Sequence, residues 1–323
     1  MTALLQVQGL CTEFATRAGT VKAVDDVSFS VEAGQIMGLV GESGSGKSMT
    51  GYSIMGLIDA PGKVTTGSIL FKGRELRGLA PEPMRQLRGN RIAMIFQDPM
   101  MTLNPVLRID TQMVEAVLAH RAVSRDDALA LARAALVKVG IAAPDARLQA
   151  YPHQFSGGMR QRVAIAIALI NQPDLIICDE PTTALDVTIQ GQILHEMQAV
   201  CRDSGTALIW ITHDLSVVAG LADTVCVMYA GKVVESGTTL QVLESPRHPY
   251  THGLIASAPS RNARGAPLHQ IPGMTPSLLN LGPGCAFRAR CASASEACAA
   301  TPPLHTSGAR TLRCFHPVAG DIS

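Results

Sequence analysis

A glycine-rich segment that ends in lysine and serine carries the clearest chemistry in this sequence. Residues 41–48 read Gly-Glu-Ser-Gly-Ser-Gly-Lys-Ser, which matches the P-loop pattern in full. Glycines let the backbone wrap tightly, so that successive N–H groups point at phosphate oxygens. A lysine in this place reaches the outer phosphates, and the serine hydroxyl binds Mg²⁺. The predicted phosphate-binding residues are Gly41, Ser43, Gly44, Ser45, Gly46, Lys47 and Ser48.

An acidic pair follows an apolar run further along the chain. Leu175–Cys178 is apolar, and Asp179 and Glu180 come directly after it. Alone, such a pattern is more often a strand that meets solvent. Beside a P-loop, Asp179 is expected to hold Mg²⁺, and Glu180 to orient and deprotonate an attacking water. The two motifs together indicate a nucleoside triphosphatase.

The elements that must position these residues alternate between strands and helices. Leu4–Leu10 and Val27–Val31 show strand-like alternation around a polar turn at Thr16–Thr20. Gln35–Val40 leads into the P-loop and Ser48–Leu57 continues as a helix, which gives strand, loop and helix in the required order. Further strands are expected at Ile92–Phe96, Leu175–Cys178 and Ala207–Thr212, with a hairpin formed by Val225–Tyr229 and Lys232–Glu235. This alternation predicts an α/β fold with a mostly parallel sheet.

Changes in composition suggest how the chain is divided. Ala-rich helical stretches such as Asp126–Val139 predict a helical insertion over about residues 98–160. After about Val242 prolines recur and apolar periodicity fades. We therefore expect one domain over residues 1–243 and a loop-rich extension over residues 244–323, which a metal or a partner would have to stabilise.

Composition and charge exclude some classes of protein. The 27 Lys and Arg residues and 26 Asp and Glu residues nearly cancel, and no long basic run is present, which argues against binding to nucleic acid. The longest purely apolar run, Val163–Ile170, is far shorter than the roughly 20 residues that span a bilayer. With no secretory signal at the N-terminus, a soluble chain is expected, and any membrane role would come through partners.

The eight cysteines fall into two groups. Four are scattered and are expected to be small buried hydrophobes: Cys11, Cys178, Cys201 and Cys226. Four crowd into the last 39 residues: Cys285, Cys291, Cys298 and Cys314. Their separations match neither the close pairs of common zinc sites nor the common ferredoxin spacings. In a chain without an export signal they indicate one soft metal centre held by four thiolates, and the spacing does not choose the metal.

A third motif resembles the signature of the ABC ATPase family. Residues 155–162 read Phe-Ser-Gly-Gly-Met-Arg-Gln-Arg, whereas the usual core is Leu-Ser-Gly-Gly-Gln. Phe155 and Met159 depart from that core. The resemblance implies that the intact Ser156 and Gly158 face the γ-phosphate of ATP bound by a partner subunit. As a purely structural feature, Ser156 would cap the N-terminus of a helix.

Other positions resemble further motifs of that family, in the right order. Gln97 is similar to the Q-loop glutamine, which senses magnesium and couples to membrane subunits. Ala184-Leu185-Asp186 looks like the D-loop, with Asp186 at the nucleotide, and His213 looks like the switch histidine that contacts the γ-phosphate. Phe14 would stack on adenine, although an ordinary packing role is nearly as plausible. The resemblance covers residues 1 to about 243 and implies ATP and Mg²⁺ as cofactors.

Several segments narrow the resemblance to importers of dipeptides, oligopeptides or nickel. They are Phe96–Met100, Leu103–Pro105, Tyr151–Gln154, Met228–Gly231 and Arg247–Thr251, together with the four late cysteines. Within that family the sequence is most similar to the dipeptide permease ATPases of the D type. The implied fold is an ABC cassette of the P-loop NTPase class, with a mostly parallel core sheet, an antiparallel N-terminal β part, a helical insertion and a metal-binding extension. The implied function is to power peptide import, with nickel or glutathione as alternative cargo.

The same resemblance implies an assembly. Two different ATPase subunits would form a heterodimer around two ATP molecules, docked on two membrane permease subunits that an extracytoplasmic receptor supplies. The chain would then lie peripherally on the cytoplasmic face of the inner or plasma membrane. The resemblance also favours a four-iron four-sulfur cluster over zinc at the four cysteines. The alternative interpretations are a non-transport ABC ATPase and an exporter. The sequence argues against both, because it has a single cassette without heptads, basic patches or membrane spans.

Overall fold

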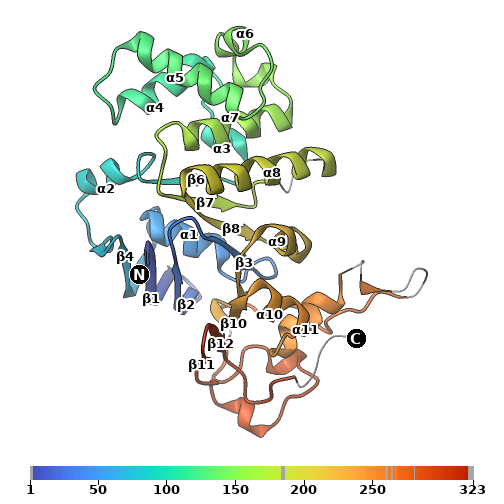
Figure 1. The fold of residues 1–323 in the computed structure, drawn as a ribbon. Helices are drawn as coiled ribbons and strands as arrows, with labels where there is room; N and C mark the ends of the chain where they lie inside the picture. Colours follow the sequence, from blue (N-terminus) through green and yellow to red (C-terminus); the bar gives the residue numbers. More distant parts are fainter. Residues whose placement is uncertain are drawn as a thin grey trace. The chain divides into compact units, whose positions relative to one another are not determined.

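The computed structural model describes residues 3–182, 186–258, 261–262, 265, 267–279 and 281–318. Its contacts divide the chain into two compact units (Figure 1), one made of Met1–Glu32, Ile36–Gly78 and Trp210–Ser323, the other of Ala33–Gln35 and Leu79–Ile209. Strand β8 (Ala207–Thr212) contains the point where the chain passes from the second unit back to the first. The two units are described in turn.

The first unit contains an antiparallel sheet and part of a mixed one. The antiparallel sheet has the order β2-β1-β4-β5 and is built from β1 (Leu5–Thr16), β2 (Gly19–Val31), β4 (Gly62–Phe71) and β5 (Arg74–Glu75). In the mixed sheet β3 (Ile36–Val40) runs parallel to β9 (Thr224–Tyr229), which forms a hairpin with β10 (Lys232–Thr238). Helices α1 (Lys47–Met55) and α9 (Leu215–Leu221) also belong to this unit. The predicted hairpin around Ala230-Gly231 is confirmed, with Ala230 at φ 47° and Gly231 at φ 83°.

The C-terminal extension continues this unit and is loop-rich, as predicted, with short helices and strands between its loops. Helix α10 (Thr239–Glu244) leads into the extension. The extension contains α11 (Pro249–Ala256), short 3-10 helices at Arg288–Arg290 and Glu296–Ala299, β11 (His305–Ser307) and β12 (Arg310–Leu312). Proline at the first position of α11 costs no hydrogen bond, so Pro249 marks the start of a helix rather than a loop. Strand β12 pairs antiparallel with β10, so the extension adds a strand to the sheet that contains β9 and β3 (Figure 1, red).

The second unit is mainly helical. Its strands β6 (Ile92–Ile95) and β7 (Leu175–Asp179) pair in parallel and are wholly buried. Its helices are α2 (Pro81–Leu87), α3 (Pro99–Thr102), α4 (Ile109–Leu118), α5 (Arg125–Lys138), α6 (Pro144–Leu148), α7 (Gly157–Leu169) and α8 (Val187–Ser204), with a 3-10 turn at Pro152–Gln154. The predicted strands and helices of this region are present, and the fold is the predicted α/β arrangement with parallel strand pairs and an antiparallel N-terminal β part.

Candidate functional site

The P-loop joins the carboxyl end of β3 to the N-terminus of α1, as predicted. Gly46 caps the helix in a left-handed conformation with φ 101°, and Lys47 is the first helical residue. The Lys47 ammonium donates hydrogen bonds to the carbonyl oxygens of Gly41 at 2.7 Å and Glu42 at 2.9 Å. The Lys47 side chain is therefore held over its own loop, at the helix N-terminus that favours an anion.

Two glycines of this loop are required by close backbone approach. A Cβ on Gly41 would lie 2.2 Å from the carbonyl oxygen of Met228, and one on Gly46 would lie 2.3 Å from that of Ala23. By contrast, a Cβ on Gly44 would meet no atom within 4 Å. The loop is thus packed against the β9–β10 hairpin and β2 at its two ends, and its middle is open.

The acidic pair and the predicted Q-loop glutamine come together in the second unit. Asp179 ends β7 and is 1% exposed. Glu180 follows at φ 44°, an uncommon conformation for a residue with a side chain. The Gln97 side-chain amide donates to the Glu180 carboxylate, with Nε2 to Oε2 at 3.3 Å. The structure therefore pairs the predicted base with a residue more than 80 positions away in sequence.

The predicted signature starts helix α7, and its serine caps the helix. The Ser156 hydroxyl accepts a hydrogen bond from the Met159 N–H at 3.3 Å. Phe155 is buried, so this residue keeps the apolar packing role of the leucine that is usual at its position. A Cβ on Gly158 would lie 3.2 Å from Ile189, whereas one on Gly157 would meet nothing within 4 Å. This helix terminus offers a small, open surface that an anion can approach.

The remaining predicted site residues lie at separate places. His213 is exposed directly after β8, and Asp186 is exposed as the residue before α8. Phe14 is half-buried on β1, and its ring lies where a Cβ on Gly62 would come within 2.4 Å. Ala184 and Leu185 of the predicted D-loop lie outside the described residues.

The four late cysteines all line one small cavity in the extension. Cys285, Cys291, Cys298 and Cys314 surround about 10 Å³ of space, roughly the room of one water molecule. Burial raises the pKa of the Cys285 and Cys291 thiols, and raises that of Cys314 to about 11. Within the described part of the chain, no three Cys, His, Asp or Glu side chains already form a ligand set for a metal ion. The donor types, four cysteine thiols, fit a soft metal.

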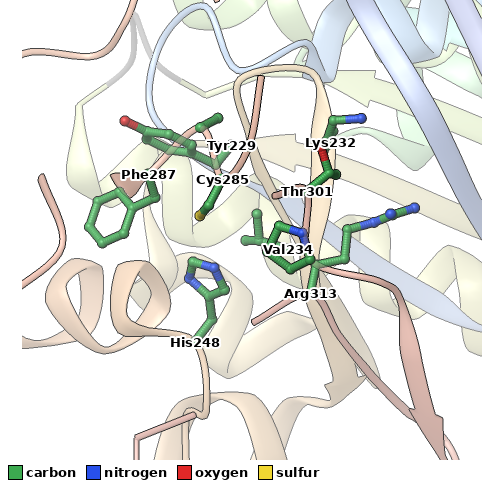
Figure 2. A pocket seen from close by; sticks show the side chains of 11 residues that line it. Tyr229, Lys232, Val234, His248, Cys285, Phe287, Thr301 and Arg313 are labelled. Carbon is green, nitrogen blue, oxygen red and sulfur yellow. The ribbon is translucent and has the colours of Figure 1, made fainter. Parts of the chain in front are cut away.

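A second small cavity shares Cys285, His248 and Phe287 with the first. Figure 2 shows Cys285 with its sulfur among Phe287, Tyr229 and His248, all of which line a space of about 20 Å³. Burial lowers the pKa of His248 to about 4, so its ring is neutral at pH 7. Tyr229, Tyr250 and Phe287 pack with ring centroids 4.6 to 5.5 Å apart.

Contacts of Glu42 in the P-loop were not predicted from the sequence. Its carboxylate pairs with Arg290 and accepts from Thr275, and its backbone N–H donates to the Tyr250 hydroxyl. All three partners lie in the extension, more than 200 positions away. Neither spacing nor periodicity of the sequence signals such contacts.

Comparison with known protein families identifies the class. The ABC transporter family model matches residues 24–183, and the model for the oligopeptide/dipeptide transporter C-terminal region matches residues 234–298. Among solved structures, the dimeric bacterial ABC transporter cassette MJ0796 superposes with a TM-score of 0.66 at 25% identity, over 73% of this chain and 98% of that one. The fold and the site therefore define an ABC ATPase, which uses ATP and Mg²⁺.

Curated relatives are similar over nearly the whole length. The oligopeptide transport ATP-binding protein OppD of Escherichia coli is 47% identical over 98% of this chain and 94% of its own. The dipeptide transport ATP-binding protein DppD of Bacillus subtilis is 49% identical over 98% of this chain and 95% of its own. The chain therefore belongs to the ABC transporter ATP-binding proteins that carry the oligopeptide/dipeptide transporter C-terminal region. In the described residues, no helix combines the length and apolar character needed to cross a bilayer.

Proposed function

We propose that this ATPase powers the import of dipeptides or oligopeptides through a membrane transporter. The observation that carries the proposal is the extension, because residues 234–298 match the oligopeptide/dipeptide transporter C-terminal region and residues 24–183 match the ABC transporter family. The relatives from Escherichia coli and Bacillus subtilis, named as oligopeptide and dipeptide transport ATP-binding proteins, support it. Nickel or glutathione import is the alternative that the sequence leaves open.

The proposed chemistry assigns a role to each motif. The P-loop from Gly41 to Ser48 binds the phosphates, with Lys47 on the outer ones. Ser48 and Asp179 would hold Mg²⁺, which neutralises charge on the phosphates when bound. Glu180 takes a proton from the attacking water. The hydrogen bond between Glu180 and Gln97 supports a place for both side chains next to that water.

The remaining motifs act in a dimer. Ser156 and Gly158 would contact the γ-phosphate of a nucleotide held by the partner subunit, and the open helix terminus of α7 supports this role. His213 would contact the γ-phosphate, Asp186 would lie at the nucleotide, and Phe14 would stack on the adenine. A second, homologous ATPase chain would complete the sandwich, on two permease subunits supplied by an extracytoplasmic receptor. The chain would then be peripheral to the cytoplasmic face of the membrane.

The function can be tested by reconstitution. The chain, co-expressed with its neighbouring transporter components, should co-purify with membrane subunits, and proteoliposomes should take up a labelled tripeptide only with Mg·ATP and receptor. Lys47→Ala is expected to abolish that uptake, because phosphate binding is lost. Uptake of nickel or glutathione but not of peptides would show that the cargo is not a peptide. If the chain hydrolyses ATP but neither binds membrane subunits nor changes its activity in their presence, the transport role is wrong.

We further propose that the four cysteines of the extension hold a structural four-iron four-sulfur cluster, with zinc as the alternative. The support is that all four thiols line one cavity. A bound metal would displace their protons and cross-link segments that are otherwise mostly loop. Protein purified without oxygen is expected to show broad visible absorption and about four irons and four sulfides per chain, which Cys298→Ser should abolish. Colourless protein with one zinc per chain would reject the cluster.

A further inference from the structure

Glu42 places a carboxylate inside the loop that binds phosphates. Lys47 donates to the Glu42 carbonyl, so the residue is an integral part of the turn. Its side chain is only 26% exposed. A negative charge in this loop would repel nucleotide phosphates, since Coulomb interactions are weakly screened where water is scarce. The structure must therefore compensate for it.

Arg290 compensates for that charge with two parallel hydrogen bonds. Its Nη1 lies 2.7 Å from Glu42 Oε2 and its Nη2 lies 3.1 Å from Oε1, the bidentate geometry of strong Arg–carboxylate pairs. Thr275 donates a third bond to Oε2 at 2.8 Å. Burial favours the neutral acid, but these hydrogen bonds outweigh it and hold the pKa of Glu42 below its ordinary value.

The guanidinium itself is fixed in place. The Arg290 side chain is 6% exposed, and its Nε donates to the carbonyl of Pro272 at 2.9 Å. Its Cζ atom lies 5.9 Å from the ring centroids of both Tyr229 and Phe287. A buried arginine that is held by hydrogen bonds and aromatic faces cannot leave the carboxylate without losing several contacts at once.

Tyr250 fixes the backbone of the same residue. Its hydroxyl accepts the Glu42 N–H at 2.8 Å, and its ring is fully buried in the aromatic group. The side chain and the main chain of Glu42 are thus both held by the extension. Lys47 rests on the carbonyls of Gly41 and Glu42, so a shift of Glu42 would also move the acceptors that orient the lysine.

We propose that Arg290 is a positioning residue for ATP binding: it cancels the charge of Glu42 and, with Tyr250, holds the start of the P-loop in its phosphate-binding shape. The C-terminal extension is then a part of the nucleotide site of its own subunit. This inference rests on the nucleotide-binding role of the P-loop, and it adds that a segment more than 240 residues away determines nucleotide affinity.

A charge role and a merely structural role give different results in a mutant cycle. Arg290→Ala leaves Glu42 uncompensated and is expected to weaken binding of Mg·ATP about tenfold, the order expected for one partly screened charge. Glu42→Gln removes the charge and should bind ATP at least as well as the unmodified chain. The double variant should recover to within about threefold, because no charge is left to compensate.

The test measures dissociation constants of Mg·ATP by calorimetry on the full chain, at low and high salt. Arg288→Ala is the matched control, because Arg288 is an exposed arginine on the same 3-10 turn. The loss of affinity in Arg290→Ala should shrink as salt rises, and the control should stay within about twofold of the unmodified chain.

If Arg290→Ala does not fold, the affinity of Glu42→Gln decides the question. An affinity of Glu42→Gln that is lowered about tenfold would overturn the charge role. A double variant as weak as Arg290→Ala would overturn it too, whereas failure of the unmodified chain to bind ATP would reject the proposed function instead.

Discussion

Replacing Glu180 with glutamine is expected to lower ATP turnover by roughly a thousandfold while ATP still binds. Glutamine has nearly the same shape and can stay at the left-handed position after β7, but its amide cannot take a proton from water. General-base catalysis contributes about 10² to 10⁴ in rate, so the loss should fall in that range. Lys47 and the P-loop are unchanged, so nucleotide affinity should be kept.

The measurement is phosphate release under saturating Mg·ATP, with binding followed separately. Glu115→Gln is the control, because Glu115 is an exposed glutamate on α4 of the same unit and should turn over ATP normally when replaced. Proteoliposomes with Glu180→Gln should show no peptide uptake. Normal hydrolysis by this variant would mean that another group activates the water.

Removing Arg310 is expected to destabilise the chain by about 3 kcal/mol. Arg310 pairs with Glu235, whose side chain is fully buried on β10. The Glu235 carboxylate also accepts the backbone N–H groups of Arg247 and His248, each at 2.9 Å. Arg310→Ala would leave that carboxylate buried with no cationic partner, which costs far more than the loss of a surface pair.

Urea unfolding of the full chain measures this effect as a shift of the midpoint at unchanged slope. The exposed pair of Arg85 and Glu82 provides the comparison, since its side chains are 54% and 59% accessible. Arg85→Ala should leave the midpoint unchanged within error. Equal shifts in the two variants would show that the Glu235 site is hydrated or that its charge is compensated in another way.

Local sequence patterns predicted the elements of the nucleotide site well. The P-loop, the strand before the acidic pair and the Ala230-Gly231 hairpin each depend on residues that are close in the chain, such as glycines at turns and runs of β-branched side chains. The signature serine was also predicted to cap its helix, and Ser156 does so. Such features follow from backbone geometry that single residues determine.

The extension could not be predicted in the same way. Its helix α11 begins at a proline, and its strands β11 and β12 have three residues each. The contacts that fix it are long-range and polar: Arg290 with Glu42, and Arg310 with Glu235. Charged residues in a proline-rich segment look like solvent-exposed loop until the fold brings an opposite charge to them.

The pairing of β12 with β10 has a consequence for incomplete chains. β12 covers part of β10 at Glu235 and Ser236, so a product that stops before Arg310 would leave those backbone groups without their strand partner. Uncovered sheet edges are templates for association with other chains. A polypeptide truncated before Arg310 would therefore expose part of the β10 edge and would be prone to pair with strands of other chains.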